Sequence, residues 1–378
     1  MIKAVLLDMD NTLLKNPDKE FAIAFLDLFE RHFAAAGIEN AAKKYRSAIG
    51  VMSSQQQGDT TNRQVTLELL SDDIELANHT LDSFYSESFP KLKQCISPVD
   101  GAVELIHRLR DADYAVIIAT NPIYPETAIR QRMTWAGLPL EEGLYSLITS
   151  ADNMHFAKPD PAYYAEILGR VGIEPDEAVM VGDSIRNDIN PAKQVGLQTF
   201  HTGDTGISAF VDVLDDVLGA TYAVQLRPEM IEPQFRGNIG ATFGFVETVQ
   251  EHFWHQRPDP EEWSIIQILC HLVTSEEEIE RKRLLKILQE NNPFITQPEQ
   301  PGPDIDACAD TGDVVVKDFM KTRQETIKLI ETFSEKDWQR PARHSIFGLT
   351  TMLEMAYFTA QHDRLHLNQL CQTIGRCE

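Results

Sequence analysis

The feature that most constrains the fold is an apolar run, Ala4–Leu7, that leads directly into the acidic sequence Asp8-Met9-Asp10. Strand-like runs of this kind cover Ala4–Met9, Ala115–Ala119, Ser146–Ser150, Ala178–Gly182 and Gln198–His201, and stretches with helical periodicity separate them. Strands that are apolar throughout and alternate with helices are typical of a parallel sheet covered on both faces. We therefore expect an α/β domain with a parallel sheet over residues 1–222.

A long segment separates the first two predicted strands. It spans about 100 residues, far more than one crossover helix needs. Helical patterns occur at Phe21–Ala35, Gln64–Leu70 and Asp73–Phe89, so we expect an inserted helical domain over residues 16–95. The crossover helix itself is predicted over Gly101–Ala112.

From Glu229 onward the pattern changes to long amphipathic helices. We predict them at Ile231–Trp254, Trp263–Glu290, Val314–Phe333 and Leu349–Thr373. A Pro- and Asp-containing segment, Asn291–Gly312, reads as a long crossover loop. The prediction is an all-α four-helix bundle over residues 229–378, preceded by a linker at 223–228.

Charge and cysteine usage limit the functional classes. The chain of 378 residues has 34 basic and 58 acidic side chains, a formal net charge of −24. Such a chain repels nucleic acids and anionic membranes, so we expect neither as a partner, and no apolar run is long enough for a membrane-spanning helix. An anionic substrate would need a local positive field from a metal ion or a buried lysine. The chain has five cysteines, which look like free thiols without a disulfide framework or a zinc ribbon: Cys95, Cys270, Cys308, Cys371 and Cys377. Free thiols favour the cytoplasm. We also expect no signal peptide.

Polar side chains follow four of the predicted strands, where ligands bind in open α/β sheets. Each could instead be a turn or capping residue. Asp8 could act as a nucleophile and Asp10 as a proton donor. After the second predicted strand come the hydroxyl of Thr120 and the amide of Asn121. Lys158 follows the third strand, before a predicted helix. Asp183 and Asp188 follow the fourth.

These residues belong to four short motifs that follow one another along the chain: DMDNT, IIATN, AKPDP and GDSIRND. With these motifs in this order, the first 220 or so residues resemble the haloacid dehalogenase superfamily. The long insert is similar to the helical cap of its phosphatase-like branch. The resemblance implies a Rossmann-like core and Mg²⁺-dependent phosphoryl transfer. Dehalogenases of this family lack the second acid of the first motif, so the presence of Asp10 favours a phosphatase that acts on a small phosphorylated metabolite.

The resemblance also implies roles for the individual residues. Asp8 is the nucleophile that forms an aspartyl-phosphate, and Asp10 exchanges protons with the leaving group and water. Mg²⁺ is held by the Asp8 carboxylate, the Asp10 carbonyl and Asp183. Asp188 is an outer ligand or bridges to the lysine. Lys158 orients Asp8, and the phosphoryl oxygens are bound by Thr120, Asn121 and Lys158.

The insert is expected to determine specificity, but its sequence says little about how. A polar stretch could contact a leaving group or could equally be a solvated loop. It consists of Gln55, Gln56, Gln57, Thr60, Thr61, Asn62 and Arg63.

In the last predicted helix, His362 and His366 lie four residues apart, on one face, which suits two ligands of one metal ion. A third candidate is His271, in the second helix of the bundle. An isolated pair of this kind is more often coincidence, and a lone buried histidine is more often a hydrogen-bonded core residue. His344 is expected in a loop or at the start of the last helix.

Together with the segments WSIIQILCHL, HSIFGLTTMLEM and QHDRLHLNQL, these histidines make residues 229–378 resemble the DinB/YfiT-like superfamily. The resemblance implies a divalent metal, Zn²⁺ or Ni²⁺, bound to His271, His362 and His366. It also raises a low-molecular-weight thiol as a possible co-substrate.

Three functions remain open from the sequence. The first is a Mg²⁺-dependent phosphatase fused to a metal-binding bundle. The second makes the bundle the main catalyst, a metal-dependent thiol transferase or hydrolase. The third makes the bundle a non-catalytic scaffold that forms a homodimer.

Overall fold

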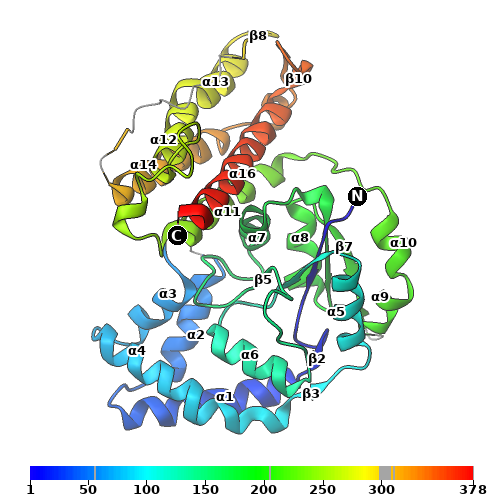
Figure 1. Ribbon diagram of the computed structural model, residues 1–378, viewed down its shortest axis with the longest axis vertical. Coiled ribbons are helices and arrows are strands. Elements are labelled where there is room, and N and C mark those ends of the chain that lie inside the picture. The colour runs from blue at the N-terminus through cyan, green and yellow to red at the C-terminus, as the bar shows by residue number, and fades with distance from the viewer. Residues whose placement is uncertain (55–56, 204–205, 298–307, 310, 378) are drawn as a thin grey trace. The chain divides into compact units, whose positions relative to one another are not determined.

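The computed structural model describes residues 1–54, 57–203, 206–297, 308–309 and 311–377 (Figure 1). Contacts divide the chain into two compact units. The first consists of Met1–Tyr164 and Pro175–Val224, and the second of Ala165–Glu174 and Gln225–Glu378. Each unit has its own hydrophobic core.

A five-stranded sheet forms the centre of the first unit, with the order β5-β4-β1-β6-β7. Every neighbouring pair in it is parallel. All residues of the central strands β1 and β6 are buried, as expected for strands covered on both faces. All five predicted strands are confirmed, although most are shorter than predicted: β1 Ala4–Leu7, β4 Ala115–Ile118, β5 Leu147–Ile148, β6 Ala178–Gly182 and β7 Gln198–His201.

Helices connect and cover these strands (Figure 1). The predicted crossover helix is present as α5, and it buries Leu105, Ile106 and Leu109. A single π-helical turn at Ile185–Ile189 follows β6 and leads into α8. The helices between and after these strands are α5 Ala102–Asp111, α6 Glu126–Trp135, α7 Pro161–Val171, α8 Asn190–Gln194, α9 Ser208–Asp212 and α10 Leu214–Gly219. The later part of α7, from Ala165, belongs to the second unit.

Two short antiparallel strands, β2 Leu14–Lys15 and β3 Ser97–Pro98, bracket the inserted domain. Between them, the described residues form four α-helices and two shorter helical turns. The second helix, α2, has no counterpart among the predicted helices. The elements are α1 Asp18–Ala35, α2 Ala41–Met52, α3 Asn62–Leu70, α4 Ile74–Ser83 and the turns Phe84–Ser88 and Phe89–Cys95.

Aromatic side chains fill the core of the insert. Phe21, Phe25, Phe29 and Phe33 recur every four residues on α1, so they line one face of the helix and are all buried. Phe25 packs edge-on against Phe84, with 5.5 Å between ring centroids. This aromatic stripe fixes which face of α1 turns inward.

The second unit is mainly helical, as predicted. Long helices α12, α14 and α16 run alongside one another, and α11 packs on α14 and α16 (Figure 1). The predicted second helix is interrupted by a π-helical turn at Glu276–Glu280, so that it forms α12 and α13. The helices are α11 Ile231–Val246, α12 Ile265–Ser275, α13 Arg281–Gln289, α14 Gly312–Ile330, α15 Glu335–Trp338 and α16 Met352–Cys377.

A small sheet in this unit corrects two expectations. Strand β8 (Phe294–Ile295) pairs with β9 (Pro341–His344), which pairs with β10 (Gly348–Thr351). His344 therefore lies in a strand, and the last helix begins at Met352 rather than Leu349. The hairpin forms because Gly348 takes a positive φ of 74°, a conformation that glycine adopts without strain. Of the predicted crossover loop at 291–312, residues 298–307 and 310 lie outside the described part of the chain.

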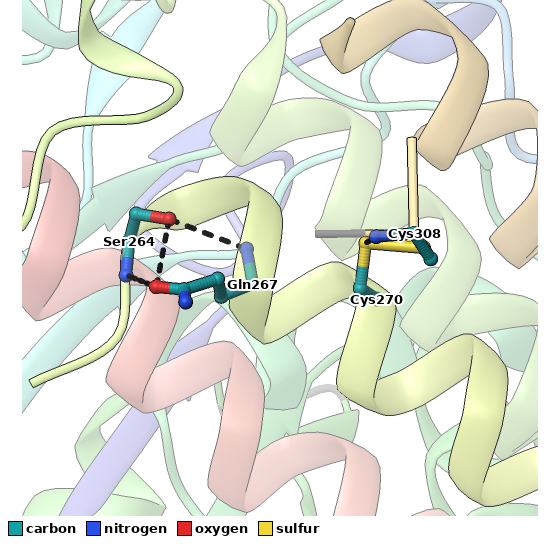
Figure 2. The surroundings of a disulfide bond; sticks show 4 residues. All are labelled: Ser264, Gln267, Cys270 and Cys308. Carbon is teal, nitrogen blue, oxygen red and sulfur yellow. Dashed lines mark hydrogen bonds between the residues drawn. A yellow bond between two sulfur atoms is a disulfide. The ribbon is translucent and has the colours of Figure 1, made fainter. Parts of the chain in front are cut away.

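The cysteine prediction was wrong for one pair. Cys270 on α12 forms a disulfide with Cys308, with their Cα atoms 5.5 Å apart (Figure 2). The amide of Cys308 also donates a hydrogen bond to the sulfur of Cys270. A separation of 38 residues gives no sequence signal, and only the fold brings the two together. Cys95, Cys371 and Cys377 are free. Because disulfides are rare in reducing compartments, this pair weakens the case for the cytoplasm.

Within the described residues, no helix combines the length and the apolar character needed to cross a membrane.

Candidate functional sites

The first site is built at the carboxyl ends of β1 and β6. The strand pairing continues through the amide of Asp8, which donates to the carbonyl of Val181 at 2.9 Å, so the Asp8 side chain lies at this sheet edge. Lys158 reaches the same point from the segment before α7. Its ammonium group donates to Asp8 at 2.7 Å and to Asp188 at 2.6 Å. One buried lysine thus links the first, third and fourth motifs.

The local fold around Asp188 holds that carboxylate in place. Its second oxygen accepts a hydrogen bond from the amide of Ser184 at 2.9 Å. Gly182 makes room for it, because a Cβ there would be 2.5 Å from that oxygen. Both oxygens of Asp188 are therefore occupied by donors, and the residue serves to position Lys158.

The electrostatics of the cluster follow from burial. Asp8, Lys158 and Asp188 are 6%, 3% and 1% exposed. Burial raises the pKa of Asp8 well above its usual range, although the charge of Lys158 opposes this shift. Burial also raises the pKa of Asp183 to about 6, and the charge of Asp188 adds to that shift. The pKa of Lys158 is raised because the charges of Asp188 and Asp8 outweigh its burial. A single buried lysine thus lies beside three carboxyl groups, those of Asp8, Asp183 and Asp188.

The residues present fit a divalent cation. Carboxylate oxygens of Asp8, Asp183 and Asp188 lie within 4.8 Å of one another, and Mg²⁺ prefers oxygen ligands. Asp188 accepts hydrogen bonds from Lys158 and Ser184, and Asp8 accepts them from Lys158 and, at 3.3 Å, from the hydroxyl of Thr12. The structure thus brings together three of the four residues for which the sequence predicted a metal-binding role; the fourth is Asp10, whose carbonyl was predicted as a ligand.

Asp10 has a partner that the sequence reading missed. Arg132 on α6 donates to both carboxylate oxygens of Asp10, with Nη1 at 3.1 Å from Oδ2 and Nη2 in close contact with Oδ1. Asn16 donates to the same Oδ1 at 2.6 Å. Arg132 is 1% exposed, and within the sequence it looks like an ordinary helix residue, so nothing marks it. The one sequence signal for such a partner is the pair of acids at the end of β1, Asp8 and Asp10, whose charges favour a nearby cation.

Of the residues predicted to bind phosphoryl oxygens, Asn121 lines the pocket above the cluster and Thr120 does not. Thr120 is 1% exposed, and its carbonyl accepts a hydrogen bond from Tyr163 at 2.8 Å. Its predicted contact with substrate therefore remains a prediction.

The pocket has a volume of about 750 Å³ and opens over Asp8, Asp10 and Asp183. The insert contributes Asp18, Phe21 and Ala22 of α1 to its wall. None of the described residues from the predicted polar stretch lines it: Gln57, Thr60, Thr61, Asn62 and Arg63. Gln55 and Gln56 lie outside the described residues.

Two of these stretch residues have structural partners. Buried Asn62 donates to the carbonyls of Pro122 and Phe156 at 3.2 and 3.1 Å. Arg63 pairs with Asp82 at 2.5 Å and Asp152 at 3.2 Å. Asn62 and Arg63 therefore lie in α3 with partners inside the protein, and the alternative of a solvated loop was wrong for them.

The second site lies in the helical unit. His271 of α12 and His362 and His366 of α16 each offer a ring nitrogen, and these atoms lie within 4.8 Å of one another. The ring centroids are 4.5–5.4 Å apart. Burial, with the neighbouring imidazoles, lowers the pKa of His271 to about 4 and that of His362 to about 3. Neutral imidazoles that converge in this way fit a divalent metal.

Neighbouring side chains orient these rings. Gln369 lies 2.9 Å from Nδ1 of His366, and hydrogen bonds of this kind fix which nitrogen faces a metal. Trp263 stacks 6.0 Å from His366 and lies 4.8 Å from His271. The hydroxyl of Ser264 caps α12 with Gln267, which sets where the helix carrying His271 begins (Figure 2). Sequence reasoning named the three histidines and missed Trp263.

Residues 2–196 match the family model of haloacid dehalogenase-like hydrolases, and this is more than half of the chain. The chain belongs to the haloacid dehalogenase-like hydrolases. Residues 234–370 match the model of the DinB superfamily. Both families expected from the sequence are confirmed, and the protein is a fusion of the two.

Several curated phosphatases are similar to this haloacid dehalogenase-like hydrolase. A glyceraldehyde 3-phosphate phosphatase of Methanopyrus kandleri is 26% identical over 204 residues, 53% of this chain and 83% of that protein. A validoxylamine A 7'-phosphate phosphatase of Streptomyces hygroscopicus subsp. limoneus is 27% identical over 224 residues, 57% of this chain and 93% of that protein. A phosphoglycolate phosphatase of Aliivibrio fischeri is 26% identical over 203 residues, 53% of this chain and 83% of that protein.

Among solved structures, a phosphatase of the same family from Thermococcus onnurineus is 22% identical, covers 59% of this hydrolase and all of its own chain, and has a TM-score of 0.36.

Proposed function

We propose that the first unit of this hydrolase is a Mg²⁺-dependent phosphatase of small phosphomonoesters that works through an aspartyl-phosphate on Asp8. The observation that carries the proposal is the buried cluster in which Lys158 holds Asp8 and Asp188 at 2.7 and 2.6 Å, beside Asp183. The phosphatase relatives support the substrate class. The ligand would be a small phosphorylated metabolite.

The chain's own groups account for each step. An oxygen of Asp8 attacks phosphorus while the bond from phosphorus to the ester oxygen breaks, and Asp10 gives a proton to the leaving alkoxide. In the second half, Asp10 takes a proton from water as its oxygen attacks phosphorus, which frees Asp8 and inorganic phosphate. Lys158 keeps Asp8 oriented, and Asn121 and Thr120 are proposed to hold phosphoryl oxygens.

Asp8, Asp183 and the Asp10 carbonyl would hold the Mg²⁺, with Asp188 positioned behind them. When bound, the ion supplies positive charge that lets a phosphate dianion approach the carboxylates.

The test uses p-nitrophenyl phosphate with wild type and Asp8→Asn. The isosteric amide is a poor nucleophile, so we expect turnover to fall by about 1000-fold or more, and chelation of Mg²⁺ to abolish it in the wild type. The exposed Asp27→Asn on α1 is the matched control and should keep full turnover. Activity that survives in Asp8→Asn would sink the assignment of the nucleophile.

A second function is proposed for the helical unit, because three neutral histidines converge there. We infer that His271, His362 and His366 bind Zn²⁺ or Ni²⁺ and leave a coordination position open, as three-histidine sites with catalytic roles do. The helical unit would then act either as a transferase with a low-molecular-weight thiol as co-substrate or as a metal-dependent hydrolase.

Metal analysis of the full chain tests it. Wild type should retain close to one equivalent after gentle purification, and His362→Ala with His366→Ala should retain below about 0.1. His79→Ala, on α4 of the first unit, is the control and should bind as wild type does. Equal metal content in all three would count against the site.

A third possibility is that the helical unit is a scaffold that forms a homodimer. Light scattering on the full chain distinguishes this, since a monomeric mass rules it out. We also keep two proposals from the sequence, the absence of nucleic-acid partners and of membrane partners, which follow from the charge of −24. The proposal of a cytoplasmic location rested on free cysteines, and the Cys270–Cys308 disulfide counts against it.

A further inference from the structure

Arg132 and Asp10 face each other in the pocket wall. The carboxylate of Asp10 accepts hydrogen bonds from Nη1 and Nη2 of Arg132 and from Asn16 at 2.6 Å. The partner of the Arg132 guanidinium is thus a carboxylate that lines the same pocket as Asp8.

Arg132 is built to bind a planar anion. Its guanidinium is buried and lies over the rings of Phe21 and Tyr124, at 5.1 and 5.7 Å, which hold its plane. Its two terminal nitrogens already donate to both oxygens of one carboxylate, that of Asp10, in the forked geometry that guanidinium groups prefer. Its Nε is buried and has no hydrogen-bond partner among the described residues. The group can therefore serve a second carboxylate without rebuilding the pocket wall.

The charges of the pocket leave few other places for a second anionic group. Five carboxylates line it: Asp8, Asp10, Asp18, Asp183 and Asp188. Against them stand Lys158 and Arg132, and Lys158 is already held by two of the acids. A negative group on the leaving alcohol would be repelled by the other walls, so Arg132 is where it would bind.

Resting on the proposed phosphatase function, we propose that Arg132 recognises a carboxylate on the substrate, so that the preferred substrates are phosphomonoesters of small hydroxy acids. The substrate carboxylate takes the place of Asp10 on the guanidinium, and Asp10 keeps its hydrogen bond from Asn16.

The test compares two esters of equal length, 2-phosphoglycolate and 2-hydroxyethyl phosphate, which differ by the carboxylate. We expect wild type to favour 2-phosphoglycolate in kcat/KM by about 100-fold, the size of effect typical of a buried charged pair. Arg132→Gln should bring this ratio close to one. Arg130→Gln is the matched control, because Arg130 lies on the same helix and pairs with Glu126 outside the pocket.

p-Nitrophenyl phosphate separates failure of this inference from failure of the phosphatase proposal. It carries no carboxylate and its leaving group departs without a proton, so wild type should hydrolyse it whether or not Arg132 recognises an acid. If wild type hydrolyses none of the three esters, the phosphatase proposal fails and this inference fails with it. If wild type hydrolyses p-nitrophenyl phosphate but shows no preference for the carboxylate, only the inference is overturned.

Two other outcomes also decide the matter. If folded Arg132→Gln loses all three substrates equally, Arg132 positions Asp10 or binds phosphate, and recognition of a carboxylate is overturned. If Arg132→Gln does not fold, wild type alone gives the answer. Glycolate should then inhibit hydrolysis of p-nitrophenyl phosphate competitively and ethylene glycol should not, whereas equal inhibition would overturn the proposal.

Discussion

At the scale of single residues, Gly182 shows how closely the first site is packed. A Cβ at this position would lie 2.5 Å from an oxygen of Asp188, a separation that forces the carboxylate to move. We predict that Gly182→Ala shifts Asp188 away from Lys158. Turnover of p-nitrophenyl phosphate should fall by about 100-fold and the free energy of unfolding by about 1–3 kcal/mol.

The control for this variant is Gly50→Ala on α2, where a Cβ meets nothing within 4 Å. It should leave turnover unchanged and raise stability slightly, since alanine favours a helix. Normal activity in Gly182→Ala, measured by steady-state kinetics beside urea unfolding, would show that Asp188 tolerates displacement.

The three bundle histidines give a pH dependence with a defined sign. The pKa of His271 is lowered to about 4 and that of His362 to about 3, both chiefly by burial. Between pH 6.5 and these values the unfolded chain binds more protons than the folded one, so stability rises with pH. The metal-free unit should be most stable above pH 6.5 and should lose stability as the pH falls toward 4.

This is checked by thermal unfolding of the chelated protein at pH 7.5, 6 and 5. The double variant His271→Gln and His362→Gln removes these groups, and its unfolding temperature should fall less between pH 7.5 and 5 than that of wild type. Identical slopes would mean that the histidines titrate normally in the folded state.

At the scale of helices, a buried ion network joins α14, α16 and the π-helical turn Glu276–Glu280 that follows α12. Arg323 of α14 donates to Glu276 and to Asp363, both at 2.6 Å, and it is 1% exposed. Asp363 follows His362 in the sequence, so this network fixes the rotation of α16 and thereby the direction of the histidine. The network thus links the packing of the helices to the metal site.

We predict that Arg323→Leu lowers the free energy of unfolding of this unit by about 3–5 kcal/mol, because it leaves two buried acids without their cation. The matched change Lys282→Leu removes an exposed cation that pairs with Glu278, and it should cost under about 1 kcal/mol. Urea unfolding of both variants gives the comparison. Equal losses would mean that the buried network contributes little.

Helices and strands could be predicted from the sequence where a segment carries one clear hydrophobic pattern. The apolar runs gave all five strands, and phenylalanines at four-residue spacing marked α1. The acids at the ends of β1 and β6, with Lys158, were placed at one site because the carboxyl ends of parallel strands meet at one edge. Whether each of them performs its predicted role stays open to the experiments above.

Features that depend on distant contacts could not be predicted. Arg132 meets Asp10 across 122 residues of sequence, and nothing in its own helix marks it as different from Arg130. Strands β9 and β10 pair only because Gly348 allows the turn, and an apolar stretch with polar interruptions had suggested a helix. Cys270 and Cys308 lack any spacing signal.

At the scale of the whole chain, the disulfide should affect the two units differently. It closes a loop of 38 residues within the second unit, and a loop of this size stabilises by about 3–4 kcal/mol on the chain-entropy model. We predict that Cys308→Ser lowers the unfolding temperature of the helical unit and leaves that of the α/β unit unchanged. Calorimetry with two transitions would show this directly.

Cys95→Ser is the control, since Cys95 is a free thiol in the first unit. It should leave the transition of the helical unit where it is. Should Cys308→Ser move neither transition, the bond would contribute nothing measurable to folding.

The same bond changes what a protease can do to the polypeptide. Because Cys270 and Cys308 are covalently joined, a single peptide cleavage anywhere from 271 to 307 leaves the two fragments attached. On a non-reducing gel such a nicked chain migrates as one band, and a reductant separates it into an amino-terminal piece and a carboxyl-terminal piece. The nicked protein would therefore keep His271 on one fragment and His362 and His366 on the other, still tied together across the cut.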